Sequence, residues 1–151
     1  MKSNFEIYKN AKKLHKEGRL VEALNIYLNL VQTDQNDFEL YFLIGTIFLQ
    51  INNLDKSIEY LTKSINLNFK FSNSFNNRGI AHAKKSEYLN AIKDYDEAIK
   101  LNPSNFDANL NKAIALKNVK KYDESLKLFF NKSPLFNKPS IKFLFKCMHL
   151  S

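Results

Sequence analysis

Small residues recur along this chain at a fixed spacing of 34 residues. From the N-terminus they are Ala11, Gly45, Gly79, Ala113 and Cys147. A constant spacing of this length is typical of chains built from stacked copies of one small unit, since a single unit cannot bury its apolar face alone. The spacing therefore predicts a repeat protein, and it limits the possible folds more than any other feature of the sequence.

Each repeat contains two apolar patterns of helical period. In the unit 38–71 the first pattern is Tyr41, Ile44, Phe48 and Ile51, and the second is Leu54, Ile58, Leu61 and Ile65. Asn52 and Asn53 separate the patterns, as expected for a short turn. The next unit ends at Pro103, which prevents continuation of a helix, and Ser104 or Asn105 can cap the helix that follows. We expect an antiparallel helix pair in each unit, with the small residue where the two helices cross closely.

The composition agrees with helices that are seldom interrupted. The 151 residues include three Gly, three Pro and one Cys. The longest apolar stretch, residues 40–51, is far shorter than the roughly 20 residues that span a membrane, and no apolar run opens the chain as in a signal peptide. We therefore expect no membrane insertion and a cytoplasmic location. A single cysteine excludes an internal disulfide and a cysteine-based zinc site.

A family signature fits this repeat, most clearly in the third unit. That unit carries Phe75, Arg78, Gly79, His82, Ala91, Tyr95, Ala98 and Pro103. These positions resemble the tetratricopeptide repeat family, whose pattern is a large residue, a Leu-Gly-like pair, an aromatic, Ala, an aromatic, Ala and Pro. The resemblance implies an all-α fold, a right-handed superhelix in one domain over residues 1–151. Its four repeats are expected over residues 4–37, 38–71, 72–105 and 106–139.

The C-terminal end follows the pattern least well. The fourth repeat has the weakest match, and Pro139 opens another segment. We expect a further helix over residues 140–151, with Cys147 at the buried small position. This helix either caps the solenoid or is the first helix of a fifth repeat, and both interpretations stay open.

Residues that could support catalysis are scattered. The three histidines, His15, His82 and His149, lie far apart in the sequence, and His82 occupies an aromatic core position of its repeat. Cys147 and His149 are two residues apart, which directs them to different faces of a helix. Asp94, Asp96 and Glu97 cluster on a second helix, where we expect a solvated face. We therefore expect no enzyme activity, no cofactor and no metal.

The resemblance implies that the first helix of each repeat lines a concave groove. The residues expected to bind a partner there are Tyr8, Lys12, Phe42, Leu43, Asn73, Asn77, Lys84, Asn111, Lys117 and Asn118. Asn77 and Asn111 share one position in successive repeats. A carboxamide both donates and accepts, so such a row can hold an extended peptide by its backbone. The pair resembles the asparagine row in the peptide-binding superhelix of O-linked N-acetylglucosamine transferases.

Two further features bear on that groove. Tyr8, Phe42, Leu43 and Leu49 form an apolar set that is either an exposed pocket or part of the core. The carboxylate clamp of chaperone co-factors in this family needs Lys and Asn in one repeat, Asn in the next, and then Lys and Arg. Those positions hold Tyr8, Lys12, Leu43, Asn73 and Asn77 here, which argues against binding of a chaperone's acidic tail in this way.

The sequence thus predicts an adaptor that binds a protein or peptide in its groove. One alternative is a regulatory or docking module of a larger enzyme. Another is binding of nucleic acid or an anionic surface through residues 106–151, which contain nine lysines and only three acidic residues. Arginine occurs only at Arg19 and Arg78, which weakens the nucleic-acid alternative. The identity of the partner and the oligomeric state do not follow from the sequence.

Overall fold

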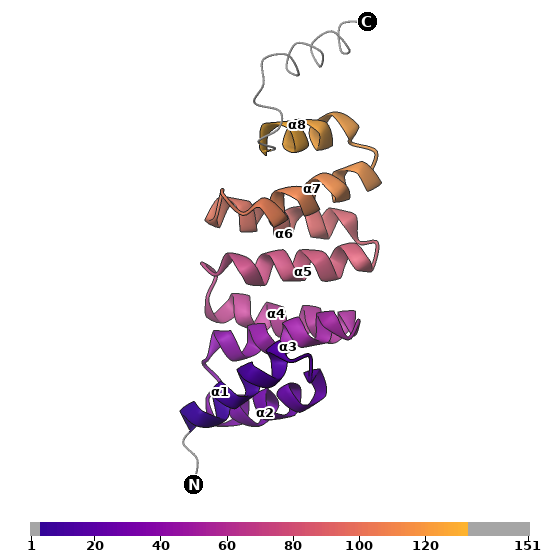
Figure 1. Ribbon diagram of the computed structural model, residues 1–151. Coiled ribbons are helices and arrows are strands. Elements are labelled where there is room, and N and C mark those ends of the chain that lie inside the picture. Colours follow the sequence, from indigo (N-terminus) through magenta and orange to yellow (C-terminus); the bar gives the residue numbers. More distant parts are fainter. Residues whose placement is uncertain (1–3, 133–151) are drawn as a thin grey trace, which may run out of the picture.

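The computed structural model describes residues 4–132, which form eight α-helices and no strand (Figure 1). The helices are α1 (Asn4–Lys16), α2 (Leu20–Thr33), α3 (Phe38–Gln50), α4 (Leu54–Leu67), α5 (Ser72–Lys84), α6 (Tyr88–Leu101), α7 (Phe106–Asn118) and α8 (Tyr122–Lys132). Helices α3 to α8 follow one another in chain order away from the end formed by α1 and α2, which confirms the all-α solenoid. The helix expected over residues 140–151, with Cys147 and His149, lies outside the described residues.

One turn conformation joins the two helices of every pair. Its central residue has a positive φ in each case: 77° at Gly18, 60° at Asn52, 63° at Ser86 and 63° at Lys120. Only the first of these is glycine, so the other three hold an L side chain in the left-handed region, which costs roughly 1 kcal/mol. The residue after the turn donates a backbone hydrogen bond back into the first helix, as Asn53 does to Phe48 at 2.8 Å.

Caps at the starts of the odd-numbered helices differ between repeats. Asp37 Oδ1 accepts from the backbone N–H groups of Glu39 and Leu40, and Asn105 Oδ1 accepts from that of Ala108 at 3.0 Å. The equivalent residue before α5 is Phe71, which provides no side-chain cap. Its ring instead packs edge-on against Phe38 and Phe42, with centroids 5.2 and 5.0 Å apart. An aromatic cluster thus takes the place of a polar cap at this junction.

The small residues of the repeat lie where the helices of a pair cross. A Cβ atom added at Gly79 would lie 2.6 Å from Tyr95 Cε1, and one at Gly45 would lie 2.7 Å from Leu61 Cγ. Both distances are too short for real side-chain contacts, so these two crossings require glycine unless the facing side chain moves. This confirms the reason for the small residue that the spacing suggested.

Apolar packing is concentrated in the first two repeats. A continuous cluster there includes Tyr27, Leu40, Ile44 and Ile47, which are almost fully buried. The corresponding cluster further along is built mainly from Ala91, Tyr95 and Ala115. The stack is therefore formed from large side chains at its N-terminal end and from small ones towards α7.

Asp94 does not lie on a solvated face, so that expectation was wrong. Its side chain is buried and accepts two hydrogen bonds from Arg78, at 2.7 and 2.9 Å. Arg78 stands where the family has a Leu-like residue, and its guanidinium also donates to Thr62 at 3.0 Å. The arginine and the aspartate therefore replace an apolar contact between α5 and α6. Asp96 is exposed and pairs with Lys112 at 2.6 Å.

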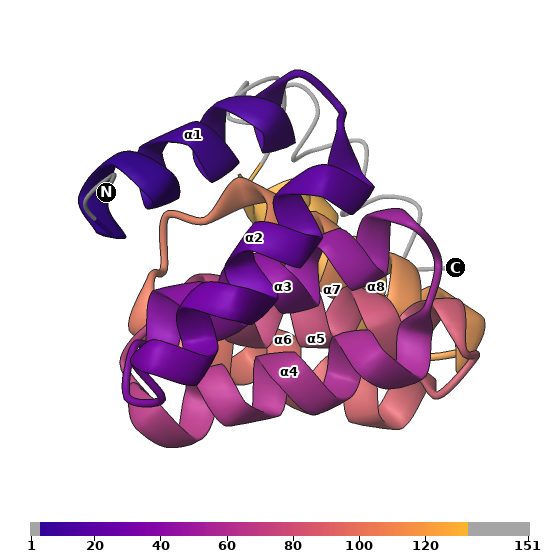
Figure 2. The same cartoon turned by 90° about the horizontal axis from the view of Figure 1, so that it is seen from below.

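The first helix stands apart from the other odd-numbered helices. Seen along the solenoid, α1 lies away from the stack that contains α3, α5 and α7 (Figure 2). No Cα atom of α1 comes within 8 Å of α3, whereas α3 adjoins α5 and α5 adjoins α7. The spacing between the odd-numbered helices is thus wider at the N-terminal end.

Candidate partner-binding groove

A row of short polar side chains crosses three of the odd-numbered helices. Asn77 Nδ2 of α5 donates to Thr46 Oγ1 of α3 at 3.0 Å. Asn76 Nδ2 lies 3.4 Å from Asn77 Oδ1, and Asn111 Nδ2 of α7 lies 3.4 Å from Asn76 Oδ1. Asn77 and Asn111, the two predicted row members, are half-buried. They do not touch each other directly, because Asn76 lies between them.

Long charged and polar side chains bridge the wider gap between α1 and α3. Lys12 Nζ donates to Glu39 Oε1 at 2.8 Å, and His15 Nε2 lies 3.0 Å from Gln50 Oε1. The hydrogen bond from Lys12 lowers the pKa of Glu39 below its ordinary range. Burial, and secondarily the nearby Glu39 carboxylate, raise the pKa of Tyr8. Tyr8 therefore stays neutral beside a charged pair.

The apolar set predicted for the groove is packed rather than open. Leu49 is buried, and Tyr8 and Leu43 pack against the large N-terminal cluster. Phe42 is half-buried against the edge of Phe71. Of the two interpretations left open by the sequence, the structure favours core packing for these side chains.

The remaining predicted groove residues are exposed. Asn73 lies in the first turn of α5, whereas Lys84, Lys117 and Asn118 lie at the C-terminal ends of α5 and α7. Within residues 4–132, neither lysine has a carboxylate partner, and Asn118 Nδ2 donates to the Ile114 carbonyl at 2.9 Å. These residues therefore flank the polar row rather than join it.

The link between the two predicted row members was missed by sequence reasoning. Asn76 and Thr46 lie at positions that the repeat alignment assigns to the groove, but their bonds to Asn77 and Asn111 were not predicted. The pair of Arg78 and Asp94 was missed too, although an arginine in the Leu-like position was a visible signal that a buried carboxylate had to be nearby. His82 adjoins this pair, because its Nε2 lies 3.9 Å from Asp94 Oδ2. Its Nδ1 lies 2.6 Å from Glu87 Oε2, and this hydrogen bond lowers the pKa of the Glu87 carboxylate.

Over the part of the chain that the structure describes, no group of three or more His, Cys, Asp or Glu side chains could hold a metal ion. In the same part of the chain, no helix has both the length and the apolar character needed to cross a membrane.

The fold defines a class: a solenoid of antiparallel helix pairs in which the first helices α3, α5 and α7 adjoin one another. Family profiles described as tetratricopeptide repeat match residues 38–71, 72–105 and 94–127. The chain belongs to the tetratricopeptide repeat family. The first two matches begin and end at the boundaries expected for the second and third repeats.

Relatives with curated names are much longer proteins. The chain is 33% identical over 85 residues to the NADPH oxidase activator of Dictyostelium discoideum, an alignment that covers 56% of this chain and 14% of that protein. It is 30% identical over 93 residues to human DnaJ homolog subfamily C member 3, covering 62% of this chain and 18% of that protein. The chain thus spans less than a fifth of the length of these relatives.

Solved structures with the same fold include a MamA protein and a domain of RPAP3. MamA superimposes with a TM-score of 0.80 at 22% identity, over 84% of this chain and 74% of that one. The first TPR of Spaghetti (RPAP3), bound to the HSP90 peptide SRMEEVD, has a TM-score of 0.75 at 19% identity, over 78% and 93% of the two chains. Both likenesses concern the fold.

Proposed function

We propose that this chain is a protein-interaction module that holds an extended segment of a partner protein along α3, α5 and α7. The observation that carries the proposal is the row from Thr46 through Asn77 and Asn76 to Asn111. A carboxamide presents both a donor and an acceptor, which matches a peptide unit whatever its side chain. Binding would therefore depend mainly on the partner's backbone, with specificity supplied by residues that flank the row.

The internal hydrogen bonds of the row suit such a role. Two of them, both to the buried Asn76, are 3.4 Å long, beyond the usual hydrogen-bond range, so they use little of the hydrogen-bonding capacity of the half-buried Asn77 and Asn111. The one at 3.0 Å, from Asn77 to Thr46, fixes the orientation of the Asn77 carboxamide. Pre-orientation of this kind reduces the entropy lost on binding. Membership of a repeat family with a peptide-bound neighbour supports the same role.

The direct test replaces both row members, as Asn77→Ala/Asn111→Ala. Affinity capture from native lysate, quantified by mass spectrometry, should lose the partners that wild type retains, by about tenfold for two lost hydrogen bonds. Asn25→Ala/Asn66→Ala is the matched control, because both asparagines are exposed on even-numbered helices. Equal capture by the double variant and wild type, with unchanged helicity, would disprove the row as a binding surface.

A second candidate is that this module serves as the docking part of a larger enzyme. The observation in its favour is that the curated relatives extend far beyond the aligned region. Sequencing the transcript downstream of Ser151 tests it, since an appended catalytic domain is expected. Nucleic-acid binding through residues 106–151 stays a prediction, which a salt-titrated gel shift can test.

A further inference from the structure

Each member of the asparagine row has an isoleucine beside it. Ile80 lies three residues after Asn77 in α5, and the same spacing separates Ile114 from Asn111 in α7. Residues three apart lie together on one face of a helix, so each isoleucine borders the row. The two isoleucines are 34 residues apart and therefore occupy the same repeat position in neighbouring odd-numbered helices. We call them the isoleucine pair.

The isoleucine pair is a partly open apolar surface. Ile114 is 52% exposed, and Ile80 is half-buried against the small cluster around Tyr95. In α3 the same repeat position holds Thr46, whose Oγ1 accepts the hydrogen bond from Asn77 at 3.0 Å. That bond shows that this position adjoins the row. The isoleucine pair therefore offers an apolar contact to any chain that lies along the row.

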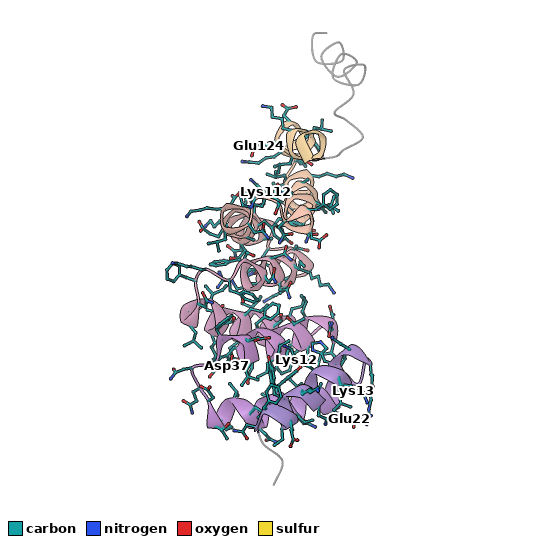
Figure 3. All side chains as sticks on the ribbon, turned by 60° about the vertical axis from the view of Figure 1, so that its left-hand side comes forward. Lys12, Lys13, Glu22, Asp37, Lys112 and Glu124 are labelled. Carbon is teal, nitrogen blue, oxygen red and sulfur yellow. The ribbon has the colours of Figure 1, made fainter. Side chains whose placement is uncertain are left out.

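The apolar surface does not continue to the N-terminal end of the groove. In α1 the same repeat position holds Lys12, whose Nζ donates to Glu39 Oε1 at 2.8 Å. Figure 3 shows Lys12 directed into the molecule, whereas Lys13 lies at the outer edge. We therefore expect apolar groups of a ligand to bind over α5 and α7, and not over α1.

Two lysines lie beyond the isoleucine pair, about one helical turn nearer the C-terminal ends of α5 and α7. Lys84 follows Ile80 by four residues, and Lys117 follows Ile114 by three, so each lysine shares a face with its isoleucine. Both lysines are exposed, and within residues 4–132 neither has a carboxylate within ion-pair distance. They place positive charge along one side of the isoleucine pair.

The carboxylates nearest to these lysines in the repeat are already paired. Glu87 Oε2 lies 2.6 Å from His82 Nδ1, and its Oε1 lies 3.3 Å from Lys85 Nζ. Lys85 also pairs with Asp55 at 2.6 Å. The acidic groove residue of α7, Asp107, lies in the first turn, at the other end of that helix. The charge of the two lysines is therefore available to carboxylates of a ligand.

The spacing of the helices determines the period of a ligand that contacts both isoleucines. Cα atoms of α5 and α7 come within 8 Å of one another, and the axes of packed helices are roughly 8–10 Å apart. In a polyproline-II segment, residues i and i+3 face the same way and are about 9 Å apart. In a β-strand, residues i and i+2 face the same way and are only about 7 Å apart. A period of three residues therefore fits this spacing better than a period of two.

A polyproline-II segment also suits the asparagine row. It has no internal hydrogen bonds, so its N–H and C=O groups can bond with the carboxamides of Asn77 and Asn111. Its conformation is largely formed before binding, which reduces the entropy lost when it is held.

We propose that the partner segment in this groove is a polyproline-II stretch in which an apolar residue and an acidic neighbour recur every three residues. This inference rests on the proposed function, because the carboxamides hold the backbone of the segment. Apolar residues i and i+3 contact Ile80 and Ile114. Their acidic neighbours face Lys84 and Lys117, and the third residue of each triplet faces solvent.

Three synthetic peptides of equal length test the period and the charge. The first repeats Leu-Glu-Pro four times. The second has the same composition but alternates leucine and glutamate ahead of four prolines, which gives a period of two, and the third repeats Leu-Gln-Pro four times. Binding to the full chain is measured by fluorescence anisotropy. The first peptide should bind several-fold more tightly than the others, and its advantage over the third should fall as salt rises.

A variant of the isoleucine pair locates the apolar contact. Ile114→Ser should weaken binding of the first peptide about fivefold, because covering the exposed half of an isoleucine contributes about half of the effect of full burial. Leu89→Ser is the matched control, since Leu89 is 65% exposed on α6 and lies outside the groove. Its binding should equal that of wild type.

A second pair of variants locates the charged contact. Lys84→Gln/Lys117→Gln should reduce the affinity for the first peptide to that for the uncharged third peptide. Lys93→Gln/Lys127→Gln removes the same charge from exposed lysines of α6 and α8 and should leave binding unchanged.

The row variant Asn77→Ala/Asn111→Ala separates this inference from the proposed function. If it loses the lysate partners while wild type binds all three peptides equally, the groove binds partners but the three-residue period is wrong. If it loses neither the lysate partners nor affinity for the first peptide, the proposed function itself fails.

Three further results would overturn the proposal. Equal losses in Ile114→Ser and Leu89→Ser would remove the assignment to the isoleucine pair. Equal losses in the two lysine variants would reduce the acidic preference to general attraction by a basic protein. Concentration-dependent self-association that Ile114→Ser abolishes would identify a second copy of this chain as the occupant.

Discussion

The second and third repeats have the same helix geometry but bury different chemistry. Ile44, in the second repeat, is fully buried in an apolar cluster, whereas the equivalent residue of the third is Arg78, which binds the buried carboxylate of Asp94. Both positions face the neighbouring even-numbered helices. The 34-residue repeat therefore determines where a side chain lies, while the residue type decides whether dispersion or a charged hydrogen bond stabilises the contact.

The groove shows the same contrast between its two ends. Long side chains, Lys12 to Glu39 and His15 to Gln50, span the wide gap at α1. Short carboxamides span the narrow gaps between α3, α5 and α7. Long exposed side chains lose more rotamer entropy when they are fixed. The contacts between α1 and α3 should therefore contribute less to stability than the carboxamide contacts between α3, α5 and α7.

The largest effect is expected where the third repeat departs furthest from the second. Asp94→Ala leaves Arg78 largely buried without its partner and should reduce the free energy of unfolding by about 3 kcal/mol. Urea denaturation followed by circular dichroism measures this loss. Hydrogen exchange should increase first in α5 and α6, since a solenoid can open locally.

The control for Asp94→Ala makes the third repeat more like the second. Arg78→Met/Asp94→Leu replaces the ion pair with apolar groups and should recover most of the stability that Asp94→Ala loses. Ile44→Ala, in the second repeat, is the reference for loss of an apolar contact, and it should reduce the free energy of unfolding by roughly 3 kcal/mol. If the double variant were as unstable as Asp94→Ala, the ion pair would be needed for more than neutralising a buried charge.

The sequence predicted the helix pairs well because they depend on periodic positions. Gly45, Gly79 and Pro103 mark crossings and ends that depend on local sterics, so one chain is enough to locate them. Contacts between repeats were harder to predict. Asp94 follows a polar pattern on its own helix, and only the three-dimensional position of Arg78 shows that it is buried.

The candidate site was predicted only in part for a similar reason. Asn77 and Asn111 share a repeat position, which the alignment reveals, but Asn76 occupies a different one and joins them through space. The sequence also did not predict that α1 leaves its outer face exposed. Lys13 on that face is exposed, whereas Ile47, at the same repeat position in α3, is fully buried.

An intermediate effect is expected at two buried serines of the second repeat. Ser64 Oγ donates to the Phe38 carbonyl at 2.9 Å and pairs with Ser74, so Ser64→Ala should cost about 1 kcal/mol. Ser57 Oγ is buried and, among the described residues, has no hydrogen-bond partner, so Ser57→Ala should stabilise by about 1 kcal/mol. The third repeat holds Ala91 and Ala98 at these positions. Thermal unfolding of both variants measures the difference, and a loss of stability in Ser57→Ala would contradict it.

The smallest effect is expected at the bridge between α1 and α3, and it depends on pH. Because Lys12 lowers the pKa of Glu39, the pair stabilises the fold above the ordinary value of 4.5, and this contribution is lost as pH falls through the lowered pKa. Both side chains are more than 40% exposed, so screening limits it to under about 1 kcal/mol. Lys12→Met should therefore lose less stability than wild type between pH 6 and pH 3, as measured by urea midpoints.

Lys63→Met, which removes an ion pair within α4, is the control. A pH dependence in Lys12→Met identical to that of wild type would mean that Tyr8 and the apolar contacts, rather than the ion pair, hold α1 against α3.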